Sequence, residues 1–178
     1  MPNIESGPGF RTVIDGNYAR VHNLLLRLVG EREAAADLTQ DTFVRAYQAW
    51  EFFRGDSQVY TWLFRIAVNL ARNHLEKQGR ERKHVDPELG EAEEMPARKH
   101  LRPEEMVERG EMSRLLADEL MALREDQREI IVLRDIQDLS YEEIAQVLGC
   151  SVSAVKSKLF RARSVLRRRL GPYLGWEA

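Results

Sequence analysis

The stretch LSYEEIAQVLGCSVSAVKSKLFRARSVLRRRL, residues 139–170, predicts two short helices joined by a tight turn. Ser140 and Glu143 have the S-x-x-E spacing of a capping box, in which each side chain satisfies a backbone N–H at the start of a helix. Gly149 permits the turn because it has no Cβ and adopts left-handed backbone conformations without strain. These features predict a helix-turn-helix.

The two helices of this motif have apolar inner faces. Ser151 or Ser153 can cap the second helix, because a serine hydroxyl accepts a hydrogen bond from a free N–H of the first turn. Ala145 is small enough to let the two helices cross closely. The expected inner residues are Ile144, Ala145 and Leu148 in the first helix and Val152, Val155 and Leu159 in the second.

The outer face of the second helix is basic. Seven Lys and Arg residues and no Asp or Glu lie between Ser151 and Leu170. A helix-turn-helix places the first half of its second helix in the major groove, where Lys and Arg pair with guanine, while later arginines suit phosphates. The alternative is a basic face that is merely solvated, but the cap, the turn glycine and the absence of acids agree on DNA binding. The candidate contacts are Ser153, Lys156, Ser157, Phe160, Arg161 and Arg163.

Charge is distributed along the chain in blocks. The 27 Lys and Arg residues nearly balance the 29 Asp and Glu residues, so the formal net charge is only -2. A second basic zone nevertheless spans residues 65–84, and an acidic segment separates it from the basic helix. Such blocks can form a nucleic-acid-binding surface that the mean charge conceals.

Several classes of site are excluded by residue type. Cys150 is the only cysteine, so no intramolecular disulfide or multi-cysteine metal site can form. The histidines are scattered, and no phosphate-binding glycine loop, nucleophile elbow or catalytic carboxylate pair is found. We therefore expect no metal, no cofactor and no enzymatic activity. No run approaches the roughly 18 apolar residues of a membrane span, so we expect a cytoplasmic protein without membrane insertion.

Apolar residues recur at helical spacing in the rest of the chain, which predicts an all-α fold. Three helices are expected in the N-terminal part. Gly30 should end the first and Gly79 the third, while Asp56 or Ser57 should cap the third. The apolar stripes are Tyr18, Val21, Leu25 and Leu28 in the first helix, Phe43, Ala46, Tyr47 and Trp50 in the second, and Val59, Leu63, Ile66 and Leu70 in the third.

Prolines among many charged residues after position 84 predict a flexible linker. We therefore expect two domains, residues 10–84 and 111–171, joined by a linker over residues 85–110. Within the second domain, the apolar spacing predicts one helix over residues 112–123 and another over residues 127–135, ahead of the helix-turn-helix.

The third helix has a polar side suited to separated DNA strands. Two guanidinium groups and two amides lie at i, i+4, i+7 and i+8, close to a tyrosine and a tryptophan. Arginines and amides bind base edges, and aromatic rings stack on unpaired bases. The alternative is a solvated helix face with the tryptophan in the core. The candidate contacts are Tyr60, Trp62, Arg65, Asn69, Arg72 and Asn73.

Three segments, in this order along the chain, resemble the extracytoplasmic-function sigma factors of bacterial RNA polymerase. DLTQDTFVRAYQAW, residues 37–50, resembles their polymerase-binding helix. FFRGDSQVYTWLFRIAVNLARNHL, residues 52–75, resembles their promoter-melting and minus-ten segment, and residues 139–163 resemble their minus-thirty-five element. The resemblance implies two small helical domains, a region 2 bundle and a region 4 helix-turn-helix, in a factor that directs transcription initiation.

The resemblance also implies roles for particular residues. Arg65, Asn69 and Asn73 match positions that recognise the minus-ten element, and the loop over residues 53–60 matches a pocket for a flipped-out base. Lys156, Ser157, Phe160 and Arg161 match positions that recognise the minus-thirty-five element.

The partners that the resemblance implies are promoter DNA, core RNA polymerase and an anti-sigma factor. The anti-sigma factor is often tethered to the membrane and would hold the protein there. The clamp helices of the largest polymerase subunit are implied to bind the polar side of the second helix, opposite Phe43 and Tyr47. The matching positions are Asp37, Gln40, Asp41, Arg45 and Gln48.

Two other classes of protein share some of these features. A conventional helix-turn-helix regulator would use residues 1–84 for dimerisation or effector binding and would bind a palindromic site alone. A scaffold or anti-sigma-like protein would bind polymerase without DNA, but the two basic zones argue against it.

Overall fold

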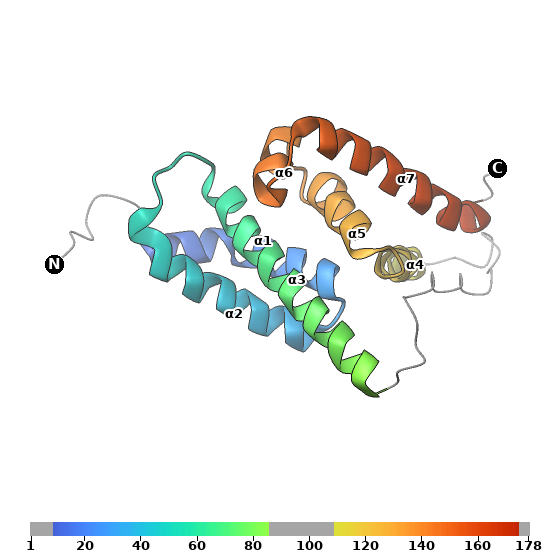
Figure 1. Cartoon of the computed structure of the whole chain (residues 1–178), viewed down its shortest axis with the longest axis horizontal. Coiled ribbons are helices and arrows are strands. Elements are labelled where there is room, and N and C mark those ends of the chain that lie inside the picture. The colour runs from blue at the N-terminus through green and yellow to red at the C-terminus, as the bar shows by residue number, and fades with distance from the viewer. Residues whose placement is uncertain (1–8, 86–108, 175–178) are drawn as a thin grey trace.

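The computed structural model describes residues 9–85 and 109–174, and every regular element in those ranges is helical (Figure 1). The expected all-α fold is therefore confirmed for the described residues. The linker expected over residues 85–110 lies almost wholly outside them. The elements are α1 Phe10–Val29, α2 Arg32–Ala49, a 3₁₀ turn Trp50–Phe52, α3 Val59–Val85, α4 Arg109–Met121, α5 Glu125–Ile131, a π-helical segment Val132–Ile136, α6 Tyr141–Leu148 and α7 Val152–Leu174.

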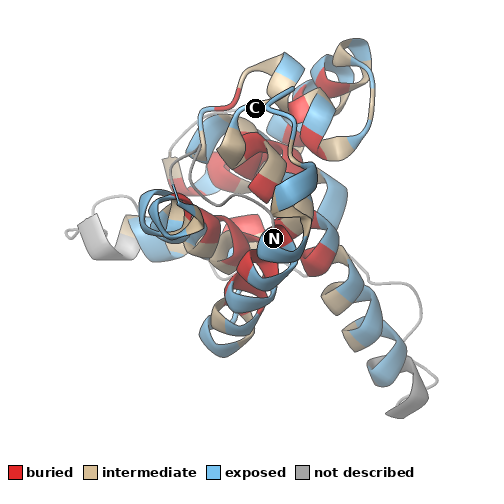
Figure 2. Cartoon of the chain, turned by 90° about the vertical axis from the view of Figure 1, so that its left-hand side faces the viewer, coloured by how far each residue is buried: buried red, intermediate tan, exposed pale blue. Residues whose placement is uncertain are grey.

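The helices α1, α2 and α3 pack against one another and form an N-terminal bundle. Its centre contains Leu24, Leu25, Leu63 and Phe64, none of which is accessible to solvent. As expected, α1 ends at Gly30, whose φ of 78° is left-handed and whose N–H donates to the carbonyl of Leu26. The buried residues face one another between the helices (Figure 2).

The helices α4 to α7 form a C-terminal bundle that contains the expected helix-turn-helix. The capping box is confirmed, because the Glu143 N–H donates to Ser140 Oγ at 3.2 Å and the Ser140 N–H donates to Glu143 Oε2 at 2.8 Å. Gly149 has a φ of 65° at the turn. Of the two candidate caps, Ser151 is used, since its hydroxyl accepts from the Ala154 N–H.

Two expected helix ends are wrong. Gly79 does not end α3, which continues through it to Val85. Glycine costs only about 1 kcal/mol relative to alanine inside a helix, and the exposed Lys77 and Glu81 form an i,i+4 ion pair across it. The same helix begins at Val59 and not at Asp56 or Ser57. The last helix of the helix-turn-helix is also not short, because α7 has 23 residues.

Some expected core residues are exposed. Tyr47 is 65% exposed, whereas Phe43 and Ala46 of the same expected stripe are buried. Tyr18 is 43% exposed and stacks on Phe43 from the edge of the bundle. In α6, Ile144 is buried as expected, but its buried neighbour is Val147, while Ala145 and Leu148 are only partly covered.

The two bundles pack directly against each other. Their buried apolar residues form one continuous cluster, and α3 contacts α6 as well as α1 and α2. Arg128 of α5 is only 7% exposed and donates to the carbonyl of Leu28 at the end of α1. The same guanidinium donates to the carbonyls of Met121 and Leu123 at 3.2 and 3.1 Å. Because the last carbonyls of a helix lack partners within it, Arg128 satisfies helix-end acceptors of both bundles.

Removal of the Ser140 cap should destabilise the C-terminal bundle. The substitution Ser140→Ala leaves the Glu143 N–H without its acceptor and should lower the free energy of unfolding by about 1 kcal/mol. Ser164→Ala is the matched control, because Ser164 is exposed and its hydroxyl only donates to the Phe160 carbonyl within α7. Urea denaturation followed by circular dichroism measures both. Equal losses in the two variants would show that the capping box adds nothing specific.

Candidate nucleic-acid interface

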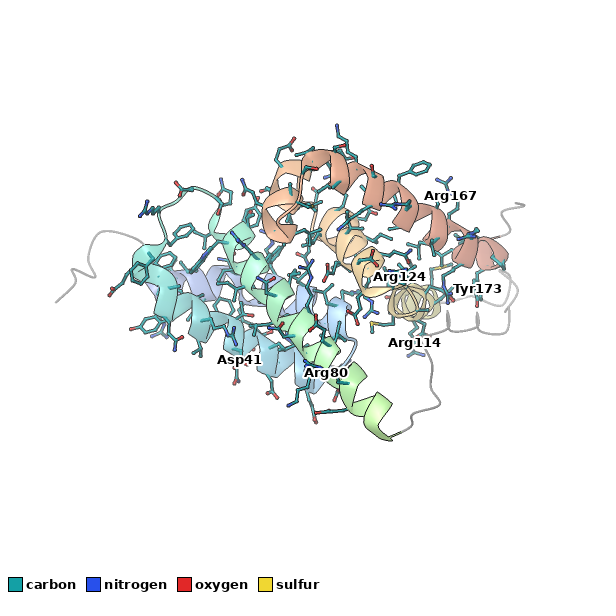
Figure 3. All side chains as sticks on the ribbon, in the orientation of Figure 1. Asp41, Arg80, Arg114, Arg124, Arg167 and Tyr173 are labelled. Carbon is teal, nitrogen blue, oxygen red and sulfur yellow. The ribbon has the colours of Figure 1, made fainter. Side chains whose placement is uncertain are left out.

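The outer side of α7 presents a continuous set of exposed polar and basic side chains. Phe160 lies among them and is 74% exposed, which is unusual for so large an apolar ring. Arg167 marks the continuation of this side toward the C-terminal end of α7 (Figure 3). All six residues expected to contact the major groove or its phosphates are exposed, namely Ser153, Lys156, Ser157, Phe160, Arg161 and Arg163.

Tyr141, at the start of α6, contacts basic residues on both sides, Lys156 of α7 and Arg134 of the π-helical segment. The guanidinium of Arg134 lies 5.3 Å and the Lys156 ammonium 5.8 Å from the centre of the Tyr141 ring, both within cation–π range. Tyr141 also lines a pocket with Lys156, Phe160 and Arg163. We did not expect a role for Tyr141 from the sequence. The one signal for it in the sequence is its place directly after the Ser140 cap.

Arg163 is held by Asp135 from the π-helical segment. Its Nε donates to Asp135 Oδ2 at 3.1 Å, and its Nη2 donates to Oδ1. The hydrogen bond to Asp135 raises the pKa of Arg163 above its ordinary value. Arg163 is therefore fixed in position on the surface while half of its side chain stays accessible.

The polar side of α3 is divided between two environments. Arg65, Asn69 and Asn73 are exposed and share one side of the helix, as the spacing predicted. Arg72 and Tyr60 instead turn toward the C-terminal bundle, where each contacts a glutamate. The sequence predicted a single DNA-binding surface for all five residues, whereas in the structure Arg72 and Tyr60 contact the C-terminal bundle.

Trp62 belongs to an aromatic cluster beside the loop that joins α2 to α3. Its ring centre lies 5.0 Å from that of Phe53 and 6.1 Å from that of Trp50, and it is partly exposed. Phe52, at the end of the 3₁₀ turn, is 79% exposed. Aromatic rings at the mouth of a loop can stack on unpaired bases, so the geometry suits a base that has left the duplex.

Arg72 and Glu129 form a bidentate ion pair between the bundles. Arg72 Nε donates to Glu129 Oε1 and Nη2 donates to Oε2, both at 2.7 Å, so the pair is bidentate. Glu129 is only 7% exposed. The hydrogen bonds to Glu129 raise the pKa of Arg72. A sequence signal for Glu129 did exist, since a charged residue directly precedes the apolar run that starts at Ile130.

Tyr60 and Glu143 form a second contact between the bundles. The Tyr60 hydroxyl donates to Glu143 Oε1, and the Arg20 guanidinium lies 4.4 Å from the centre of the Tyr60 ring. The hydrogen bond to Glu143, together with burial, raises the pKa of Tyr60. Burial alone would raise the pKa of Glu143, but hydrogen bonds from Tyr60 and Ser140 outweigh it and hold that pKa below its ordinary value.

The outward side of α2 lies away from the outer side of α7. Asp41 on α2 and Arg167 on α7 lie at opposite edges of the molecule in Figure 3. Val44 and Tyr47 are also exposed on α2, with Val44 among the polar residues of this side and Tyr47 at its edge. The residues expected to bind polymerase are all exposed there, namely Asp37, Gln40, Asp41, Arg45 and Gln48.

Two kinds of feature are absent from the described residues, a metal-binding cluster and a membrane-spanning helix. Nowhere in residues 9–85 and 109–174 do three or more His, Cys, Asp or Glu side chains come together in a way that could hold a metal ion. None of the helices in those ranges combines the length and the apolar character that crossing a membrane requires.

Family models match both halves of the chain. The model for sigma-70 region 2 matches residues 13–81, and the model for sigma-70 region 4 matches residues 113–166. The ECF RNA polymerase sigma-E factor of Haemophilus influenzae is 38% identical over 169 residues, which cover 93% of this chain and 89% of that protein. The RNA polymerase sigma-H factor of Pseudomonas aeruginosa is 38% identical over 159 residues, which cover 87% of this chain and 82% of that protein.

Two solved structures are similar to the chain as a whole. The sigma factor RpoE of Bartonella quintana, in complex with the anti-sigma factor NepR, is 28% identical, with a TM-score of 0.71. That match covers 90% of this chain and 96% of RpoE. CnrH in complex with the cytosolic domain of CnrY is 27% identical, with a TM-score of 0.65 and coverage of 91% of this chain and 87% of CnrH.

The lowered pKa of Glu143 gives its contact an acid dependence. A carboxylate whose pKa is lower in the folded state stabilises that state above its ordinary pKa, and the contribution is lost as the pH falls through the lowered value. The free energy of unfolding of the wild type should therefore fall more steeply with acid, below about pH 4.5, than that of Glu143→Gln. Glutamine preserves the capping box, so the variant should fold.

Urea denaturation between about pH 6 and about pH 3 measures this difference. The exposed neighbour Glu142 supplies the control variant Glu142→Gln. If the wild type and Glu143→Gln lost stability in parallel across this range, the carboxylate of Glu143 would not be held by Tyr60 and Ser140 in solution.

Proposed function

The chain belongs to the extracytoplasmic-function group of the sigma-70 family, and on this premise we propose which of its surfaces serves each step of transcription initiation. As a sigma factor it binds core RNA polymerase and directs promoter-specific initiation. One observation carries the assignment of surfaces. The exposed Arg65, Asn69 and Asn73 of α3 and the exposed basic side of α7 occur in one chain, together with a third polar surface on α2.

The outer side of α7 is assigned to the minus-thirty-five element. The first turns of α7 enter the major groove, where Lys156 and Arg161 pair with base edges and Phe160 packs against a thymine methyl group. Ser153 and Ser157 contribute hydrogen bonds close to the bases. Arg163, Arg167 and Arg168 lie farther along α7 and suit phosphates, which position the helix without selecting a sequence.

The exposed side of α3 is assigned to the minus-ten element, with Tyr60, Trp62 and Arg72 as further contacts. Removal of a base from the stack costs a few kcal/mol, which a specific pocket recovers only for the correct base. The loop between α2 and α3 lies beside the aromatic cluster of Trp62 and Phe53, where such a base can stack. Strand opening and sequence recognition then become one event.

The outward side of α2 is assigned to the clamp helices of the largest polymerase subunit. Exposed carboxylates, amides and Arg45 surround the exposed Val44, and the exposed Tyr47 lies at the edge. An apolar centre with a polar rim is the usual organisation of a protein–protein interface. Because this surface is remote from α7, polymerase and the minus-thirty-five element can be bound at the same time.

An anti-sigma factor is assigned as the regulator of the chain. The sigma factor RpoE, whose overall structure is similar, was solved in complex with the anti-sigma factor NepR. By the same analogy the protein acts in the cytoplasm, without catalysing a reaction and without inserting into the membrane.

The minus-ten assignment predicts a loss of transcription when the α3 amide is removed. With core RNA polymerase and a template selected from random promoter sequences, the wild-type chain should produce a specific run-off transcript. Asn69→Ala should lower the transcript roughly tenfold, as expected when one base contact is lost. Asn23→Ala removes an equally exposed amide from α1 and should leave the transcript unchanged.

Two results would contradict the assignment. No transcript in the presence of core polymerase would indicate a conventional regulator, which binds its site alone. An equal loss in Asn69→Ala and Asn23→Ala would remove α3 from promoter recognition.

A further inference from the structure

We propose that Tyr141 is a positioning residue of the minus-thirty-five interface, whose ring holds the ammonium of Lys156 ready to contact one particular base pair. This inference rests on the proposed function of α7. It gives α6 a part in sequence selection, although every residue assigned to the minus-thirty-five element lies in α7.

The Tyr141 ring and the Lys156 ammonium belong to one site. The ammonium nitrogen lies 5.8 Å from the ring centre, within the range of a cation–π contact. Both residues line a pocket of 340 Å³, together with Phe160 and Arg163. Lys156 is exposed, and in the part of the chain that the structure describes the Tyr141 ring is the one partner of its ammonium. The position of this charge therefore depends on Tyr141.

Tyr141 is itself held in place before DNA arrives. It is the first residue of α6, directly after Ser140, and the capping box defines where that helix starts. The guanidinium of Arg134 lies 5.3 Å from the ring centre, and its Nη1 donates to the carbonyl of Leu139 at 2.7 Å. Arg134 thus connects the ring to the backbone just ahead of the cap. The ring is a fixed platform for a mobile lysine.

The arginines of this interface do not need such a platform. Arg163 is held by an ion pair, and the Nε of Arg161 donates to the carbonyl of Ser157 in its own helix at 3.3 Å. Lysine has a long flexible stem and a compact charge without the fork geometry of arginine. A side chain that is ordered before binding loses less conformational entropy when the complex forms. Contact with Tyr141 therefore favours one geometry of Lys156 at the base edges over loose contacts with phosphates.

A neutral ring suits this task better than a carboxylate. A carboxylate beside Lys156 would neutralise its charge and would compete with DNA for its N–H donors. The face of an aromatic ring attracts a cation through its quadrupole and takes up none of those donors. Lys156 is thereby oriented and still keeps its charge and its hydrogen-bonding capacity for the major groove.

The first test uses the full-length chain with core RNA polymerase and a panel of templates. Each template carries the selected promoter with one minus-thirty-five base pair replaced, and run-off transcription measures the discrimination at each position. Lys156→Met should lose discrimination at the position that Lys156 contacts. Tyr141→Leu should lower discrimination at that same position about threefold, the effect of one cation–π contact at an exposed site, and should leave the other positions unchanged. Tyr141→Phe keeps a ring and should restore the wild-type pattern.

Three results of this test would overturn the proposal. An equal loss at every position in Tyr141→Leu would show that Tyr141 only supports the fold of the helix-turn-helix. A further loss at the Lys156 position when Tyr141→Leu is added to Lys156→Met would show that the ring does not act through Lys156. If Lys156→Met changed no position, the proposed role of Lys156 would fail, and this inference would fail with it.

The second test uses no DNA and no polymerase, so it separates the inference from the proposed function. Nuclear magnetic resonance of the full-length chain with ¹³C-labelled lysine should show the ε-methylene protons of Lys156 shifted upfield by the ring current of Tyr141. Lys158 lies on the opposite side of α7 and is the internal reference, and Lys156→Met identifies the Lys156 signal. The upfield shift should persist in Tyr141→Phe and disappear in Tyr141→Leu. The same Lys156 signal in Tyr141→Leu and in the wild type would overturn the proposal.

Discussion

The bidentate pair between Arg72 and Glu129 joins the two bundles through α3, a helix that has two roles in the fold. The apolar side of α3 holds the N-terminal bundle together through Leu63, Phe64 and Val68, all fully buried. Its polar side would face DNA, yet part of that side is bound to α5 and α6. The packing of the two bundles therefore covers part of the polar side of α3 and leaves Arg65, Asn69 and Asn73 exposed. The outer side of α7 takes no part in this contact, and its polar and basic residues stay exposed.

Local signals in the sequence predicted much of the fold. The Ser140 capping box and the left-handed glycines at positions 30 and 149 act within a few residues, so their chemistry can be recognised without knowledge of the tertiary structure. The exposed side of α7 could also be predicted, because helical spacing is a local property of the sequence. The prediction that Gly79 ends the third helix was wrong. A glycine inside a helix only lowers its stability, and α3 continues past Gly79 to Val85.

The contacts between the bundles could not be predicted. Arg72 and Glu129 are 57 residues apart in sequence, and the residues between them include the segment for which the charge pattern indicated only a linker. Spacing along α3 placed Arg72 with Arg65 and Asn69, since periodicity shows which side of a helix a residue occupies but not which distant element covers it. Tyr47 shows the same limit from the other direction, because its helical position suggested a core residue and the structure leaves it exposed.

The central claim is that Arg72 and Glu129 hold the two bundles together in the free chain. The most direct measurement is the distance between two labels, one on each bundle, by pulsed electron paramagnetic resonance. Cysteines at the exposed positions Asp15 and Arg168, with Cys150→Ser to remove the native thiol, supply the labels. The account predicts a narrow distance distribution in the free chain and a broader, longer one when Arg72→Glu breaks the pair. The same distance distribution with and without Arg72→Glu would contradict it.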